Sequence, residues 1–243
     1  MARTNPTPEE TSTLFTTIEQ SFPSSTLGAD KWYILTLSSL CAGGHPGKAV
    51  DLYQNLISRP EFSTSEQRQN LIKRLRETLV KLVPIIGVVK PLEAVFCIAE
   101  IERPEDRDYS FSREQWSSGP ANAQRGRAWL DQIYKHNHTA TENTLACHKD
   151  FEWLSREITY GLFLSDHTIL GPVETQLITL SGIALQNLPR ETGWHLRGTR
   201  RIGVSSEDVE KTQQCIEKVA GYCGLVLDRI PRVKDIEHEV AFD

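Results

Sequence analysis

Apolar residues recur every three or four positions along most of the chain, which is the spacing of one face of an α-helix. The clearest run lies between positions 64 and 83, where charged residues occupy the opposite face and the apolar stripe comprises Leu71, Ile72, Leu75, Leu79, Leu82 and Val83. No segment shows a convincing alternation of apolar and polar residues, the pattern typical of a β-strand. The sequence therefore predicts a protein that is nearly all α-helical.

Cap residues and breaks indicate where individual helices begin and end. The stretch Thr7-Pro8-Glu9-Glu10 combines a cap, a proline at the first helical position and a glutamate three residues after the cap. Asp30 is expected to cap a second helix. Further helices are predicted over residues 30–41, 48–57, 64–83, 129–134, 151–164, 173–188, 189–203 and 206–220, over a segment from Pro91 to Ile101, and after Gly224.

Two stretches of the chain resemble each other and indicate an internal repeat. Ile34–Leu40 (ILTLSSL) matches Leu177–Ile183 (LITLSGI), and Leu79–Gly87 (LVKLVPIIG) lines up with Ile216–Gly224 (IEKVAGYCG). The offsets are 143 residues (177 − 34) at the first match and 137 (224 − 87) at the second, so the loops differ in length. A repeat of this length predicts a duplicated helical unit that packs on its copy.

The segment 102–127 is rich in charges, broken by proline and glycine, and without helical periodicity. It is expected to be a surface connection. The chain is therefore divided into an N-terminal diverged repeat (1–101), a connecting segment (102–127) and a C-terminal repeat (128–243).

Composition narrows the class of protein. The net charge of −5 argues against a general nucleic-acid binder. No apolar run reaches the roughly 18 residues of a membrane span, and the polar, acidic start is typical of neither a signal peptide nor a transit peptide. The expected location is the cytoplasm. The five cysteines include no C-x-x-C pair and are expected to be small buried side chains rather than reactive thiols.

Glu174 and His195 lie on two consecutive predicted helices and are candidate catalytic residues. A carboxylate near an imidazole can fix its tautomer and raise its basicity, which suits acid–base catalysis. The alternative is an ordinary glutamate at a helix start and a hydrogen-bonded histidine. A tight turn at Pro189 would place His195 opposite position 183 and about two helical turns from Glu174. Glu191, on the same helix face as His195, is then a rival partner.

Trp194 and Arg197 flank the histidine and are candidate substrate-binding residues, together with Glu191. Arg197 is suited to bind a substrate carboxylate through two hydrogen bonds, while the pattern favours Trp194 as a core or subunit contact over a substrate platform. The cluster of His136, His138, Cys147 and His148 does not match a standard zinc spacing. Neither a metal nor an organic cofactor is predicted.

The order of these motifs resembles a known superfamily. Tyr160-Gly161 is followed by Glu174 in ETQLITLSGIAL, by His195 about twenty residues later, and by the Gly203-Val204-Ser205-Ser206-Glu207-Asp208 helix start. This order resembles the carboxymuconolactone decarboxylase and alkylhydroperoxidase D-like superfamily, most clearly over 151–236, with 31–101 as a diverged copy. The resemblance implies packed antiparallel helices assembled into trimers or hexamers, and a homotrimer for a chain with two copies.

The resemblance also bears on the chemistry. The peroxidase branch of the superfamily uses a C-x-x-C-x-x-x-H motif, but Leu188 and Glu191 occupy the two cysteine positions before His195. In the first copy, Lys31 stands where Glu174 stands in the second, while His45 is retained. The resemblance implies cofactor-independent acid–base chemistry on a small organic acid, lactone or cyclic ketone. The alternatives are a non-catalytic scaffold of the same fold and a peroxide-handling protein that uses a non-standard thiol.

Overall fold

The computed structural model describes residues 6–240, and every regular element in this range is a helix, as the sequence predicts. The elements and their bounds are α1 (Pro8–Ser21), α2 (Ser24–Leu27), α3 (Trp32–Ala42), η1 (Pro46–Lys48), α4 (Ala49–Ile57), η2 (Pro60–Phe62), α5 (Ser65–Ile86), α6 (Val89–Ile101), η3 (Pro104–Asp106), α7 (Pro120–Tyr134), α8 (Asn137–Leu145), α9 (Lys149–Trp153), η4 (Leu154–Leu164), α10 (Pro172–Ala184), α11 (Pro189–Arg201), α12 (Ser206–Cys223), α13 (Val233–Ile236) and η5 (Glu237–Glu239). Among the described residues, no helix is long and apolar enough to cross a lipid bilayer.

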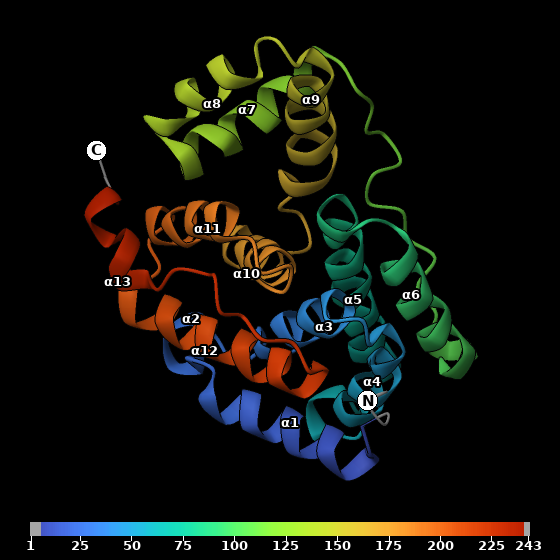
Figure 1. Cartoon of the computed structure of the whole chain (residues 1–243). Coiled ribbons are helices and arrows are strands. Elements are labelled where there is room, and N and C mark those ends of the chain that lie inside the picture. The colour runs from blue at the N-terminus through green and yellow to red at the C-terminus, as the bar shows by residue number, and fades with distance from the viewer. Residues whose placement is uncertain (1–5, 241–243) are drawn as a thin grey trace.

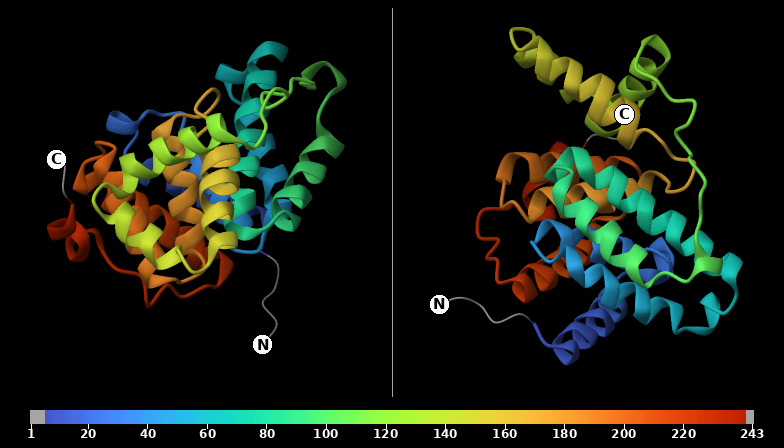
Figure 2. Two further views of the ribbon diagram at one scale, coloured as in Figure 1. Left: turned by 90° about the horizontal axis from the view of Figure 1, so that it is seen from above. Right: turned by 90° about the vertical axis from the view of Figure 1, so that its right-hand side faces the viewer.

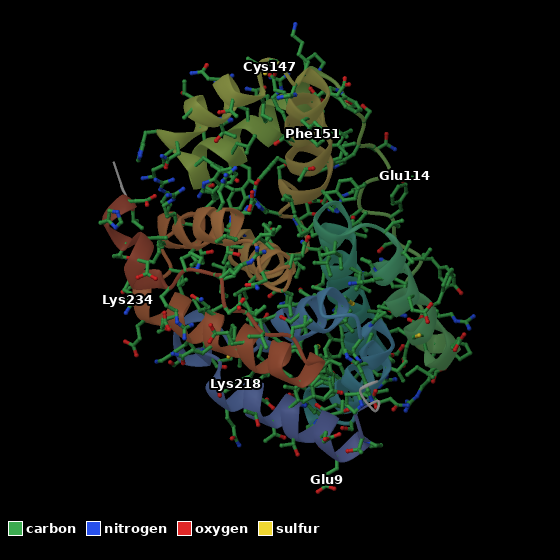
Figure 3. The ribbon with its side chains drawn as sticks, in the orientation of Figure 1. Glu9, Glu114, Cys147, Phe151, Lys218 and Lys234 are labelled. Carbon is green, nitrogen blue, oxygen red and sulfur yellow. The ribbon has the colours of Figure 1, made fainter. Side chains whose placement is uncertain are left out.

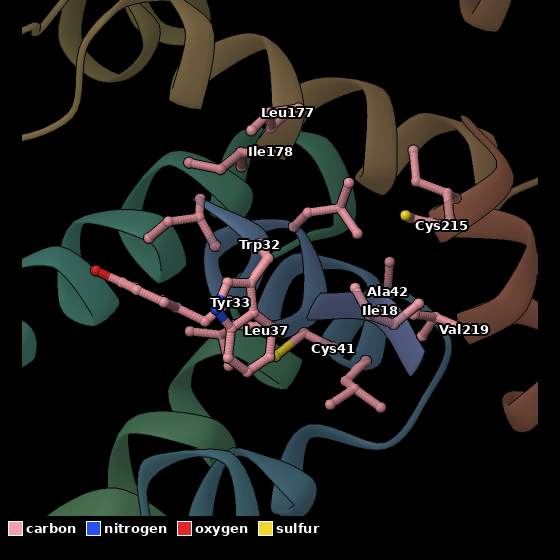
Figure 4. Packing of buried hydrophobic residues seen from close by; sticks show 14 of the residues in the cluster. Ile18, Trp32, Tyr33, Leu37, Cys41, Ala42, Leu177, Ile178, Cys215 and Val219 are labelled. Carbon is pink, nitrogen blue, oxygen red and sulfur yellow. The ribbon is translucent and has the colours of Figure 1, made fainter. Parts of the chain in front are cut away.

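Helices α3 and α10 form the centre of the molecule. Every residue of α3 and every residue of α10 from Glu174 onward is buried. A helix buried on all sides needs small or apolar residues all round rather than one stripe, and the two matching sequence stretches supply them. The two helices pack against each other. In Figure 4, Trp32, Leu37 and Cys41 lie in the same cluster as Leu177 of α10 and Cys215 of α12.

The other long helices of the main body surround this pair. Helix α5 crosses both α3 and α10, and α12 covers α3 together with α1 (Figure 1). Two of these helices begin with reciprocal capping boxes, at Thr7 with Glu10 and at Thr64 with Gln67, and the Ser205 hydroxyl accepts a bond from the Asp208 N–H at 3.1 Å. The predicted starts at Thr7, Thr64 and Ser205 are therefore confirmed.

The segment from α7 to η4 forms a separate layer over α11, which Figure 2 shows projecting from the main body. Helix α7 and η4 approach so closely that a Cβ at Gly126 would lie 2.3 Å from the Arg156 carbonyl oxygen. The layer has its own small apolar cluster, made of Trp129, Leu130, Ile133, Tyr134, Tyr160 and Leu164. Residues Cys147 and Phe151, labelled in Figure 3, lie at its outer end.

Charged side chains tie this layer to α5. Arg113 donates two hydrogen bonds of 2.6 Å to the carboxylate of Glu77. The fully buried ammonium of Lys81 donates to three carbonyl oxygens at or just after the end of η4, those of Phe163 (3.2 Å), Leu164 (3.3 Å) and Asp166 (2.6 Å). A cation near the carboxyl end of a helix stabilises the unpaired carbonyls there. Burial lowers the pKa of Lys81 to about 8.

Several predicted boundaries are wrong, each for a local reason. Helix α7 begins at Pro120, inside the predicted connection, because proline suits the first turn of a helix. The polar segment after Tyr134 forms α8 rather than a loop, because its helical face packs on α7 and α9. Lys31 rather than Asp30 is the cap position of α3, and the region after Gly224 is irregular until the single turn of α13.

Candidate functional site

A cavity of about 640 Å³ lies between α11 and the α7–η4 layer. Four of the five candidate catalytic and substrate-binding residues line it, namely Glu191, Trp194, His195 and Arg197, whereas Glu174 does not. The remaining wall comes from α5, α7, α8, η4, α10 and the start of α11, through Ile85, Leu130, Tyr134, Asn137, His138, Ala140, Thr141, Thr144, Leu145, Ser155, Tyr160, Ile183 and Arg190. The surface of the cavity is mostly apolar, and its polar groups come from α7, α8, η4 and α11; such a combination is usual for small-molecule sites.

His195 lies in the middle of α11 and is 4% exposed. Its Nδ1 lies 3.2 Å from Oε1 of Gln176 on α10. An amide oxygen in this position accepts the Nδ1–H bond, which leaves Nε2 with its lone pair. Burial lowers the pKa of His195 to about 4, so the imidazole is neutral at physiological pH.

Glu174 lies on a different face of α10 from Gln176. Two helical residues between them turn the chain by about 200°, so side chains at i and i+2 point in nearly opposite directions. The Glu174 carboxylate lies 3.6 Å from the ammonium of Lys31 and 3.6 Å from the guanidinium of Arg74. The structure therefore brings Gln176 to His195 and places Glu174 in a charged cluster at the start of α3. Lys31, which the sequence comparison placed opposite Glu174, is one of its partners.

Three aromatic side chains form the wall beside the histidine. The ring of Tyr134 meets Trp194 edge to face at a centroid distance of 5.9 Å and His195 at 6.2 Å. The hydroxyls of Tyr134 and Tyr160 lie 3.3 Å apart. Burial raises the pKa of both phenols, so both carry their proton and can donate it in a hydrogen bond.

Arg197 is the buried cation of the cavity wall, with 9% of its surface exposed. One of its terminal nitrogens forms an ion pair with the carboxylate of Glu239. Its Nε is buried and has no hydrogen-bond partner among the described residues. Burial lowers its pKa. Arg201 on the same helix is also buried, and it donates to the carbonyl oxygens of Ile133 and Tyr134 at the end of α7.

The residues that sequence reasoning missed are Tyr134, Tyr160, Gln176 and Glu239. Gln176 stands two residues after Glu174, and no spacing rule distinguishes it from its neighbour until the crossing of α10 and α11 is known. The two tyrosines come from elements remote in sequence. Tyr160 belongs to the motif Tyr160-Gly161, in which a Cβ on the glycine would lie 2.4 Å from the Asn122 amide nitrogen. That glycine is a sequence signal of a close helix contact beside the site.

The other histidines and cysteines singled out in the sequence have other partners, and of these His138 also lines the cavity. The ring of His45 meets Tyr222 edge to face at 5.9 Å. His138 pairs with Asp131 and lies 3.7 Å from Glu142. Within residues 6–240, no three His, Cys, Asp or Glu side chains are grouped so as to hold a metal ion. Burial raises the pKa of Cys41 to about 12 and that of Cys215 to about 11, which disfavours the reactive thiolate at both.

Comparison with known proteins yields one distant relative. The chain is 22% identical to Peroxisomal protein 2 of Schizosaccharomyces pombe over 194 residues, which cover 79% of this chain and 87% of that protein. No protein-family model matches the chain. No solved structure matches it either.

Proposed function

We propose that the protein is a cofactor-independent enzyme that performs acid–base chemistry on a small organic acid, lactone or cyclic ketone. The observation that carries the proposal is the convergence of His195, Arg197, Glu191 and the aromatic wall on one cavity of about 640 Å³. A volume of that size accommodates a small cyclic molecule. Decarboxylation, isomerisation or elimination needs a base, a proton donor and a site for an anion, and residues of these three kinds line the cavity.

In this proposal, the neutral imidazole of His195 is the base. The Gln176 amide oxygen holds Nδ1–H and directs the Nε2 lone pair toward the substrate, so that Nε2 accepts a proton from it. Arg197 binds a carboxylate, and the protonated hydroxyls of Tyr134 and Tyr160 stabilise negative charge that develops on a substrate oxygen. The imidazolium formed on His195 then returns the proton to the product, and Glu191, one turn away on α11, stabilises its positive charge. Glu174 acts indirectly, because its pairing with Lys31 and Arg74 fixes the rotation of α10 that presents Gln176.

The direct test is turnover of a panel of lactones and β-keto acids by the purified protein, followed by absorbance and by release of carbon dioxide. We expect at least one member of the panel to be consumed with saturation kinetics, and the rate to survive dialysis against a metal chelator. A complete lack of turnover across the panel would contradict the proposal. Loss of activity on chelation would contradict its cofactor independence.

The alternative of a non-catalytic protein of the same fold also has a specific observation in its favour. A general base works best when its pKa lies near the operating pH, and burial lowers the pKa of His195 to about 4. A cavity that binds a ligand without transforming it would tolerate such a weak base. Binding of a panel member without turnover, measured by calorimetry, would support this alternative.

The proposal includes membership of the carboxymuconolactone decarboxylase and alkylhydroperoxidase D-like superfamily, with the first repeat as a diverged copy of the second. It is supported by the two matching stretches, which form helices that are buried along their whole described length apart from the start of α10 and that pack on each other.

A trimer is part of the same proposal. Helix α6 leaves an apolar stripe exposed, formed by Val89, Leu92 and Phe96, that subunit contacts would cover. Light scattering should give about three times the 27.5 kDa of one chain; a stable monomer at micromolar concentration would contradict it.

The location within the cell is a separate part of the proposal. The sequence favours the cytoplasm, whereas the relative's name, Peroxisomal protein 2, brings the peroxisome into consideration. Imaging of the full chain fused at its N-terminus to a fluorescent protein, beside a peroxisomal marker, distinguishes the two. Diffuse fluorescence would support the cytoplasm, and punctate fluorescence that coincides with the marker would support the peroxisome.

A further inference from the structure

Three arginines of α11 hold the last described turn of the chain. Arg200 binds the Glu237 carboxylate through Nε at 2.9 Å and Nη2 at 2.6 Å, and Nη2 of Arg201 donates to the Glu239 carbonyl oxygen at 3.1 Å. Arg197 pairs with the Glu239 carboxylate. Helix α13 packs on α11, which positions the turn η5 beside that helix (Figure 1). The turn is thus held by charge at three points.

The three arginines differ in whether they also line the cavity. Arg197 lines the His195 cavity, whereas Arg200 and Arg201 do not belong to its wall. Glu239, the partner of Arg197, does not line the cavity, and its side chain is 42% exposed to solvent. The buried cation of the cavity is therefore paired with a carboxylate that lies outside the cavity wall and is partly exposed to solvent.

Such a pair is easily exchanged. The half-exposed Glu239 carboxylate regains hydration when it returns to solvent, and a ligand carboxylate that takes its place keeps the buried Arg197 paired. Inside the cavity, the Arg197 guanidinium offers several N–H donors in one plane, and its buried Nε–H has no hydrogen-bond partner among the described residues. A ligand carboxylate that approached from the cavity would satisfy that donor, which Glu239 leaves unpaired.

We propose that Glu239 is an internal competitor for the anion-binding position of the cavity, and that Arg197 selects a cyclic or aromatic monocarboxylate whose carboxylate takes the place of the Glu239 carboxylate. The ring of such a ligand packs against Tyr134, Tyr160 and Trp194, which form the aromatic wall. This inference rests on the proposed function only in so far as the cavity binds a small molecule; it does not require that the molecule be transformed.

The test compares benzoate with its neutral analogue benzamide, by titration calorimetry on the full chain. In Glu239→Gln the side chain keeps its size and the backbone bond to Arg201 while the competing charge is lost. We expect the affinity for benzoate to rise about tenfold, and that for benzamide to stay unchanged. Glu237→Gln is the matched control, since it removes an equal charge from the same turn but from Arg200; benzoate affinity should stay the same. Arg197→Gln should abolish the preference for benzoate over benzamide.

The outcomes separate this inference from the proposed function. Equal benzoate affinity in the natural protein and in Glu239→Gln would overturn the inference while leaving the cavity as a binding site. A parallel rise for benzoate and benzamide would also overturn it, because the turn would then act as a physical cover rather than as a competing charge. If neither benzoate nor benzamide bound to any variant, both the role of Glu239 and the cavity as a small-molecule site would be overturned. Melting temperatures of all variants verify that each is folded.

Discussion

His45 and His195 follow the two matching helices of the chain, yet they lie in different surroundings. His45 is the cap position of η1, in the turn after α3, and is half-buried with its ring edge toward Tyr222. His195 lies in the middle of a helix, is buried, and faces a cavity. The difference comes from the α7–η4 layer, which covers α11. Similar sequences on the two central helices are therefore not sufficient to form a cavity; the α7–η4 layer is needed as well.

The largest expected effect separates these two histidines. His195→Ala should lower turnover by about 10²–10⁴-fold, the usual contribution of a positioned acid–base group. His45→Ala, the matched control after the first of the two matching helices, should leave turnover nearly unchanged. Rates for both variants on the same substrate, with melting temperatures, make the measurement. Equal losses in the two variants would contradict the assignment of the site to the second half of the chain.

The second comparison concerns protonation. The pKa of His195 is about 4 in the native protein, against 6.5 for an ordinary histidine. Below pH 6.5 the unfolded chain binds a proton here that the native protein does not, so the free energy of unfolding falls as the pH drops from 6.5 toward 4. Stability that is present above pH 6.5 and lost as the pH falls to 4 amounts to on the order of 3 kcal/mol of the free energy of unfolding. Urea unfolding at about pH 7 and about pH 4.5 should show a smaller acid loss in His195→Gln than in the natural protein; identical losses would exclude this explanation.

The third prediction separates the layer from the main body. Gly126→Ala introduces a Cβ 2.3 Å from a backbone oxygen of η4, and we expect it to lower the free energy of unfolding by about 1–3 kcal/mol. Gly221→Ala in α12 is the control, because its Cβ would meet nothing within 4 Å and alanine favours a helix by up to about 1 kcal/mol. Chemical denaturation measures both. If Gly126→Ala were as stable as Gly221→Ala, the tight contact of α7 with η4 would not support the layer.

The smallest effect is expected at Glu174. Glu174→Gln removes a charge that lies 3.6 Å from both Lys31 and Arg74, so the free energy of unfolding should fall by about 1 kcal/mol. Turnover should stay close to that of the natural protein, since Gln176 and not Glu174 contacts His195. A loss of turnover of about 100-fold or more at an unchanged melting temperature would instead assign Glu174 to the acid–base chemistry.

Local rules predicted those features of the molecule that depend on neighbouring residues. The caps at Thr7, Thr64 and Ser205 follow from side chains within three positions, and they are confirmed. The helical class follows in the same way from the spacing of apolar residues. The segment after Tyr134 escaped this reasoning, because its polar composition hides a helix that is supported by packing on α7 and α9.

The site itself depends on contacts between distant parts of the chain. Sequence reasoning grouped Glu191, Trp194, His195 and Arg197 because they lie within two turns of one helix, and all four line the cavity. The partner of His195 depends instead on how α11 crosses α10. No local pattern fixes that crossing, which selects Gln176 over Glu174. The contact of Glu239 with Arg197 joins residues more than forty positions apart, and neither carries a motif that predicts it.

The pairing of α3 with α10 has a consequence for how the chain folds. Their matching stretches are separated by 143 residues (177 − 34), so the centre of the molecule closes a very long loop. Contacts between α7 and η4 join residues only about 35 positions apart, such as Gly126 and Gly161. Loops that are short in sequence close at a smaller entropic cost and earlier in time. We therefore expect α7 and η4, which cover the cavity, to form their helical hairpin first. The slow phase of refolding should then report the later packing of α3 on α10, which joins the two halves of the chain.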